Sequence, residues 1–217
     1  MTLLLIHLLI FYCCCAIEFC SAIEKITSIQ PINDPETIVS NGDTFKLGFF
    51  SPVNSTNRYV GIWYNDLSAA AVVWVANRDK PLNDSSGTVT ISEDGNLVVM
   101  DGQKQIVGSL NVPHSSANSS AQLLDSGNLV LRDSFGQSSI IWESFEDPSD
   151  SILQKMKIST NKYTGERTLL TSWKTSSDPS TGSFTYGMNP LDIPELYVWN
   201  GSHTYWCSGP WNGQIFI

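Results

Sequence analysis

The chain has 217 residues, a formal net charge of −9 and a charged fraction of 15%, well below the roughly 25% of an average soluble protein. The acidic charge argues against nucleic acid as a ligand, because nucleic-acid binding needs clustered lysine and arginine. A chain of this length can bury a hydrophobic core and does not need a disulfide framework. Composition therefore indicates a globular protein that is rich in uncharged polar residues.

The first segment of the chain has the pattern of a secretory signal peptide. Residues 3–17 are apolar apart from His7, and this run is shorter than the ~20 residues that span a membrane. Cys20 and Ala22 place small residues at the −3 and −1 positions of a signal-peptidase site. We predict a signal peptide over residues 1–22 and a secreted, extracellular mature chain without a membrane span. An uncleaved anchor is the alternative interpretation.

Cleavage of the predicted signal peptide would remove four of the five cysteines. Cys207 is then the only cysteine left, and the formal charge becomes −8 because Glu18 is removed. A lone cysteine in a secreted protein indicates a free thiol, an intermolecular bond or a missing partner. We predict that the Cys207 thiol is unpaired within the chain.

The remainder of the chain shows strand signals and no long apolar pattern of helical period. Each candidate strand is short, rich in β-branched or aromatic residues and bounded by Gly, Asn, Asp, Ser or Pro. The candidates, in chain order, are residues 44–50, 58–64, 71–77, 88–92, 96–100, 121–124, 128–132 and 140–145. The sequence therefore predicts an all-β protein.

A repeat runs through these strands. The stretch SEDGNLVVM at residues 92–100 returns as LDSGNLVLR at residues 124–132. Trp74 and Trp142 are 68 residues apart, with Gly108 midway between them. Three units of about 32 to 34 residues are each too small to bury a hydrophobic face alone, but could share one core around a common axis. Gly108 would leave that axis short of one large ring, so Gly108→Trp is expected to stabilise it.

Four sequons occur in turn-rich polar segments. In a secreted chain such sites indicate N-glycosylated surface loops. The acceptor residues are Asn54, Asn83, Asn118 and Asn200.

The repeated GNLV strands, with tryptophans recurring between units, resemble the bulb-type mannose-binding lectin domain. This resemblance implies a β-prism of three four-stranded sheets with a pseudo-three-fold repeat. The longer stretches DPETIVSNGDTFKLGFFSP, NRYVGIWYN, VVWVANRDKPLND and WESFEDPSDSIL are similar to the ectodomain of plant S-locus-type receptor kinases. LLTSWKTSSDPSTGSFTYGMNP and SGPWNGQIF resemble the opening of the S-locus glycoprotein domain.

The resemblance implies a lectin domain over residues 23–146 and the first, incomplete part of an S-locus glycoprotein domain over residues 147–217. Relatives of this kind carry a serine/threonine kinase domain. The sequence contains no kinase lysine, catalytic-loop or Asp-Phe-Gly motif, so no enzyme activity and no cofactor are expected of this chain.

In sugar-binding members of the lectin family the motif reads Gln-x-Asp-x-Asn-x-Val-x-Tyr, with alternate residues on one face of a strand. The resemblance maps it onto a degenerate carbohydrate site in which Ser92 replaces Gln and Met100 replaces Tyr. A second degenerate copy retains only Asn128 and Val130. The residues of the first copy are Ser92, Asp94, Asn96, Val98 and Met100.

The competing interpretation is that both copies are hairpin turns. Asp94-Gly95 and Ser126-Gly127 are good turn sequences by themselves. A monosaccharide site of millimolar affinity is worth only about 4 kcal/mol, and each lost hydrogen bond removes ~1 kcal/mol. We therefore interpret the repeat mainly as a turn and expect mannose affinity to be very weak.

Other candidate sites are weaker. His114 and His203 are isolated, so neither a metal site nor a catalytic triad is indicated. Loop acids such as Glu143, Glu146 and Asp147 could form a glycosidase pair, but solvated surface acids are the expected role. The tryptophans after the repeat could stack on sugars, and a place in a second core is the expected role; they are Trp173, Trp199, Trp206 and Trp211.

The resemblance implies an extracellular recognition module that senses a ligand, in pollen recognition or defence. Its expected partners are mannose-type glycans bound weakly, or a secreted peptide or protein, and a homo- or heterodimer with related receptor ectodomains. Two alternatives stay open at this point. One is a secreted mannose-binding lectin, and the other is a truncated product of a receptor serine/threonine kinase gene.

Overall fold

The computed structural model describes residues 24–66, 72–113, 115–133, 139–189 and 193–217. In these ranges the protein is built from strands and contains no helix, so the predicted all-β class is confirmed. No membrane-spanning helix occurs in them. The predicted signal peptide, its cysteines and His114 lie outside the described residues.

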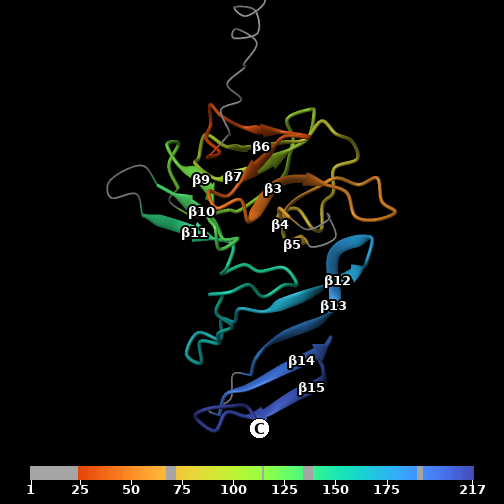
Figure 1. The fold of residues 1–217 in the computed structure, drawn as a ribbon, viewed down its shortest axis with the longest axis vertical. Helices are drawn as coiled ribbons and strands as arrows, with labels where there is room; N and C mark the ends of the chain where they lie inside the picture. Colours follow the sequence, from red (N-terminus) through yellow and green to blue (C-terminus); the bar gives the residue numbers. More distant parts are fainter. Residues whose placement is uncertain (1–23, 67–71, 114, 134–138, 190–192) are drawn as a thin grey trace, which may run out of the picture.

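Among the described residues, fifteen strands form four antiparallel sheets (Figure 1). In chain order the strands are β1 (Ile32–Asn33), β2 (Thr37–Val39), β3 (Phe45–Phe50), β4 (Tyr59–Tyr64), β5 (Val72–Val75), β6 (Thr88–Ile91), β7 (Leu97–Met100), β8 (Ile106–Ser109), β9 (Ser120–Leu123), β10 (Leu129–Arg132), β11 (Ile140–Glu143), β12 (Leu170–Thr175), β13 (Asp178–Met188), β14 (Glu195–Asn200) and β15 (His203–Pro210).

The first three sheets correspond to the three predicted repeat units. Their strand orders are β2-β3-β4-β5, β1-β6-β7-β8 and β11-β10-β9. The third sheet thus has three strands where four were expected. Ile26 pairs with Ala121 of β9 through a single bridge, so the start of the described chain takes the fourth position. We call these three sheets the lectin body.

The lectin body encloses one hydrophobic core, to which all three sheets contribute. Leu47 and Ile62 from the first sheet, Val89 from the second and Leu131 from the third are fully shielded from solvent. The alternation of apolar and polar residues along the short strands produces this arrangement because every second side chain faces inward. The shared core explains why one repeat unit could not fold alone.

The expected layer of tryptophans is present in part. The Trp74 and Trp142 rings lie 5.9 Å apart. Gly108, opposite Val99 on the neighbouring strand, borders a void of about 20 Å³, roughly the space of one water molecule. Gly108 is itself partly exposed, and the void beside it is much smaller than an indole, so the structure does not favour the expected stabilisation by Gly108→Trp.

The fourth sheet, β12-β13-β14-β15, lies below the lectin body in Figure 1 and docks on the first sheet through its β12–β13 hairpin. Trp173 of β12 stacks on Phe50 of β3, with ring centroids 6.3 Å apart. Ser149, in the connection between body and hairpin, accepts a hydrogen bond from Val75 N through its Oγ (2.9 Å) and one from Thr171 N through its carbonyl (2.7 Å).

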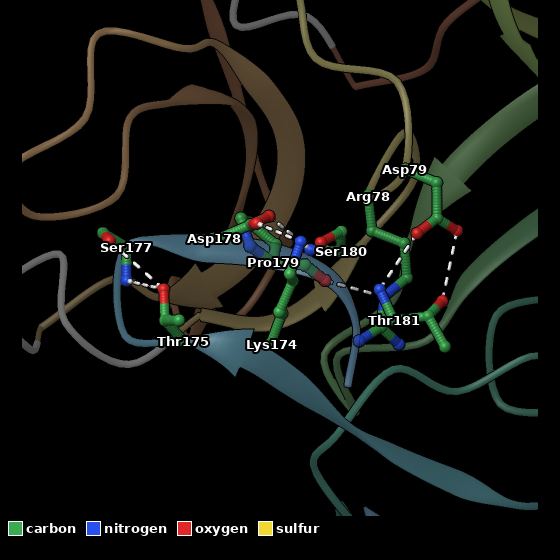
Figure 2. Close-up of polar contacts among 9 residues, drawn as sticks. All are labelled: Arg78, Asp79, Lys174, Thr175, Ser177, Asp178, Pro179, Ser180 and Thr181. Atoms are coloured by element: carbon green, nitrogen blue, oxygen red, sulfur yellow. Dashed lines mark hydrogen bonds and ion pairs between the residues drawn. The ribbon is translucent and has the colours of Figure 1, made fainter. Parts of the chain in front are cut away.

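A polar clamp of Arg78 and Asp79, just after β5, secures this docking (Figure 2). Arg78 Nε donates to the carbonyl of Pro179 at 2.9 Å, and Nη2 donates to the carbonyls of Thr171 (3.2 Å) and Ser172 (2.9 Å). Burial lowers the pKa of Arg78, and nearby acids offset part of this effect.

Asp79 completes the clamp by accepting two hydrogen bonds from Thr181. The backbone N–H donates to Oδ1 at 2.9 Å and the hydroxyl donates to Oδ2 at 3.2 Å. Figure 2 shows Arg78 and Asp79 side by side over the hairpin. Arg78 thus contacts both strands of the hairpin, and Asp79 contacts β13.

Candidate functional site

The first degenerate motif forms a tight turn that enters β7. Gly95 has a φ of 81°, a left-handed conformation that glycine adopts without strain. Asp94 accepts hydrogen bonds from the Ser92 hydroxyl and from Asn96 Nδ2, the latter at 3.0 Å. These bonds lower the pKa of Asp94, with the bond from Ser92 as the largest cause. The motif residues therefore contact one another.

Asn96 ties this turn to the segment after β8. Its side chain is only 6% exposed, and its Oδ1 accepts a hydrogen bond from Val112 N at 2.7 Å. With Nδ2 bonded to Asp94, both ends of the amide already have partners inside the protein. A sugar hydroxyl would have to displace one of these bonds.

The apolar positions of the motif are shielded as well. Val98 is 2% exposed, and Met100 is partly buried. Val98 lies opposite Thr90, so the two side chains share one face of the sheet. Thr90 Oγ1 donates to the carbonyl of Thr27 at 3.4 Å, which places the start of the described chain over that face.

The second copy repeats this structural role in the third sheet. Asn128 is 6% exposed, and its Oδ1 accepts hydrogen bonds from Ser144 Oγ (3.1 Å) and Phe145 N (3.3 Å). Its Nδ2 donates to Glu143 Oε2 at 2.7 Å. Val130 is fully buried. In both copies the asparagine fastens its hairpin to the chain 16 or 17 residues further on.

A groove with a volume of about 830 Å³ opens beside this second copy. One wall comes from the third sheet and the turn after it, and includes Asn128, Glu143 and Glu146. The facing wall comes from the connection between β11 and β12, and its charged residues are Lys155, Lys157, Glu166 and Arg167. We call this hollow the connector groove.

The sequence interpretation missed the connector groove because its walls are far apart in the chain. A signal was present, since four of the twelve basic residues fall within residues 155–167 of an acidic chain. Glu143 and Glu146, weighed earlier as a glycosidase pair, both line the groove. Asp147 instead lies near Arg78: burial raises its pKa, and the Arg78 charge lowers it in part.

The remaining predicted sites are on the surface. Cys207 is exposed on β15, and no second cysteine occurs in the described ranges. Trp206 and Trp211 are 49% and 41% exposed, so their expected place in a second core is wrong. All four acceptor asparagines of the sequons are exposed, which is compatible with glycosylation; they are Asn54, Asn83, Asn118 and Asn200.

Comparison with known proteins identifies the family. Residues 71–174 match the family model described as D-mannose binding lectin. A G-type lectin S-receptor-like serine/threonine-protein kinase of Arabidopsis thaliana is 54% identical over 191 residues, which are 85% of this chain and 23% of the relative. A second such kinase from the same plant is 49% identical over 216 residues, 98% of this chain and 26% of the relative.

The chain thus spans about a quarter of the length of these relatives. A solved monomeric mannose-binding lectin from Gastrodia elata aligns with 16% identity and a TM-score of 0.43, over 56% of this chain and 96% of its own. The family match and the kinase relatives together show that the chain contains a bulb-type lectin domain homologous to the ectodomains of plant G-type lectin S-receptor-like kinases.

Proposed function

We propose that the chain is a non-catalytic, extracellular recognition module that senses a secreted ligand, in pollen recognition or defence. One observation carries this proposal. The amides of Asn96 and Asn128, which would hydrogen-bond mannose in a working copy of the motif, are buried and bonded within the protein. In this proposal the protein keeps the lectin fold, and the asparagines at the mannose-binding positions stabilise that fold instead of binding a sugar.

The kinase activity named for the relatives is proposed to require residues other than these 217. The proposed domain organisation is a lectin domain over residues 23–146 followed by an incomplete S-locus glycoprotein segment over residues 147–217. The docked β12–β13 hairpin agrees with it, because the first three sheets share one core and the fourth sheet lies outside that core.

The experiment is calorimetry of the purified protein with mannose and with mannose-type glycans, together with a glycan array and a screen of secreted peptides. We expect no measurable mannose binding at millimolar concentration. Ser92→Gln with Met100→Tyr should raise the affinity, because these changes restore the two missing polar groups. Ser92→Gln with Met100→Leu is the matched control, which lacks the hydroxyl. Millimolar or tighter mannose binding by the unmodified protein contradicts the proposal.

A second candidate function is a secreted mannose-binding lectin. The match of residues 71–174 to the D-mannose binding family favours it, and Asp94 remains exposed at the turn. The same calorimetry separates the two functions, since only this one requires mannose affinity without substitution.

A further inference from the structure

The connection between β11 and β12 carries an exposed lysine on a stretch of backbone that is not tied to its surroundings. Lys157 is exposed, Ile158 after it is partly buried, and both lie outside the strands. Among the described residues, neither of the two has a partner for a backbone hydrogen bond. Exposed backbone without hydrogen bonds is the preferred site of proteolytic cleavage. The bond between Lys157 and Ile158 can therefore enter a protease without the loss of a hydrogen bond by either residue.

The neighbouring lysines of this connection are held in turns. Lys155 has a φ of 75°, in the left-handed region, whereas Lys157 has a negative φ. The chain directly after Lys162 is folded by Asn161, whose Oδ1 accepts hydrogen bonds from the N–H groups of residues 163 (3.0 Å) and 164 (3.2 Å). A peptide that pairs with another protein along its backbone has to be extended. Of these three lysines, Lys157 is the one whose surroundings permit this conformation.

Exposed lysines of the lectin body are protected in other ways. The bond after Lys25 leads to Ile26, which is fully buried and paired with β9 through its backbone. Lys80 is followed by Pro81, which has no backbone N–H and a fixed φ. Lys104 has a φ of 61° in a hairpin turn. Lys157 thus remains the most accessible basic residue for cleavage.

The contacts that dock the fourth sheet join residues on opposite sides of this bond. The clamp residues Arg78 and Asp79 precede the bond, and the hairpin segment 171–181 that they bind follows it. Trp173 and Phe50, which stack on each other, also lie on opposite sides of it. A cut after Lys157 would therefore leave two chains joined by noncovalent contacts.

We propose that the peptide bond between Lys157 and Ile158 is a cleavage site for serine proteases that recognise a basic residue, and that the lectin body and the fourth sheet stay docked as two chains after the cut. The serine of the protease attacks the carbonyl carbon of Lys157, and the bond to the nitrogen of Ile158 breaks. Water then releases Lys157 as a carboxylate, and Ile158 becomes a free amino terminus. The inference goes beyond the proposed recognition function and is independent of its ligand.

Cleavage changes how the two regions are coupled. In the intact chain, the connection keeps the hairpin beside the clamp at a high effective concentration. After the cut, only the docking contacts retain the fourth sheet, so that loss of the clamp releases the lectin body. Arg78 therefore determines whether cleavage separates the two regions.

The test applies a low concentration of purified trypsin to the full chain under native conditions, and intact mass spectrometry identifies the first pair of fragments. One fragment should end at Lys157 and the other should begin at Ile158. The two should elute together in size-exclusion chromatography. After the same cut, the fragments of Arg78→Ala should elute separately, because the three hydrogen bonds from Arg78 to the hairpin are lost.

Variants of the lysine identify the recognised residue. Lys157→Gln should slow the first cut by about tenfold or more, because a neutral residue leaves the charged group of the specificity pocket unpaired. Lys157→Arg should be cut as the unmodified protein is. Lys162→Gln is the matched control, since Lys162 lies in the same connection but in a turn, and it should change neither the position nor the rate of the first cut. Equal thermal midpoints of these variants show that folding is intact.

A first cut at any other residue, or equal slowing in Lys157→Gln and Lys162→Gln, overturns the cleavage site. Fragments of the unmodified protein that separate at once overturn the retained docking. Fragments of Arg78→Ala that stay together overturn the role of the clamp. Each of these results leaves the recognition function standing, because that function is measured by ligand binding to the intact chain.

Discussion

The lectin body has strands of two to six residues and the fourth sheet has strands of six to eleven, yet the shorter strands bury more of their side chains. In the described ranges the buried hydrophobic side chains lie between Ile26 and Leu131, with Leu170 and Pro179 as the exceptions. The fourth sheet instead exposes large side chains, among them Tyr205 and Trp206 at 71% and 49%. The body is therefore stabilised by its own core, whereas the fourth sheet depends on docking through Trp173, Arg78 and Asp79.

The largest expected effect is a loss of stability of the lectin body. Leu47→Ala removes a fully buried side chain from the shared core, at a cost of about 2–5 kcal/mol in free energy of unfolding. Tyr205→Ala, an exposed position of the fourth sheet, should cost far less. Thermal unfolding followed by calorimetry measures both. Similar losses of stability in the two variants would mean that side chains of the fourth sheet stabilise the protein as much as the core of the body does.

Removal of the clamp should loosen the fourth sheet and spare the body. Arg78→Ala removes three hydrogen bonds from a charged donor, each worth roughly 1.5–3 kcal/mol. Because Arg78 is partly exposed to solvent, we expect a smaller total loss of docking free energy, about 2–3 kcal/mol. Hydrogen exchange should accelerate in β12 and β13 and stay unchanged in β3 and β9. Lys80→Ala, at an exposed site nearby, is the control. Faster exchange throughout the body would show that the two regions unfold as one unit.

Asn96→Ala should destabilise the body by about 1–3 kcal/mol, because the buried Val112 N–H loses its acceptor. Asn41→Ala, an exposed asparagine in a turn, should be nearly neutral. The midpoint of urea denaturation reports both values. If Asn96→Ala leaves the stability unchanged, the motif has no structural role, and the interpretation as a sugar site is favoured again.

Gly108→Ala should stabilise the body by about 0.5–1 kcal/mol. The added Cβ would meet Asn77 Cβ at 3.5 Å and Val99 Cβ at 3.7 Å, which are ordinary contacts beside a small void. Gly61→Ala is the contrasting variant, since its Cβ would lie 2.6 Å from the Phe50 ring. Thermal midpoints should move in opposite directions. Gly108→Trp is now expected to destabilise, because the void does not hold an indole.

The smallest expected effect concerns pH. Burial raises the pKa of Asp150 above 3.8, and the charge of Arg78 and the Trp173 indole lower it in part. The ionised carboxylate therefore costs stability at neutral pH. This cost shrinks as the pH falls below the raised pKa, and it is gone below the ordinary value of 3.8, where the carboxyl is protonated in both the folded and the unfolded state. Asp150→Asn should raise the thermal midpoint slightly at pH 7 and leave it unchanged below about pH 4. Asp66→Asn, at an exposed site, should change it at neither pH.

Local composition predicted most strands of the body, because runs such as residues 45–50 and 97–100 are mostly apolar or aromatic and follow turn residues closely along the chain. β1 and β2 are too short for such a signal, and the fourth sheet has no buried face that would produce it. The connector groove could not be predicted, since Asn128 and Lys157 meet only through the tertiary fold. The carbohydrate role of the motif residues, the glycosylation of the sequons and the free thiol of Cys207 stay predictions.

The clamp has a consequence for how this protein can change during evolution. Arg78 binds the carbonyl oxygens of Thr171, Ser172 and Pro179, and every amino acid supplies such an oxygen. The contact therefore recognises the path of the hairpin backbone and not its side chains. Residues 171 and 172 can vary among descendants without loss of the clamp, so new binding surfaces can arise beyond the hairpin while the orientation of the lectin body is inherited unchanged.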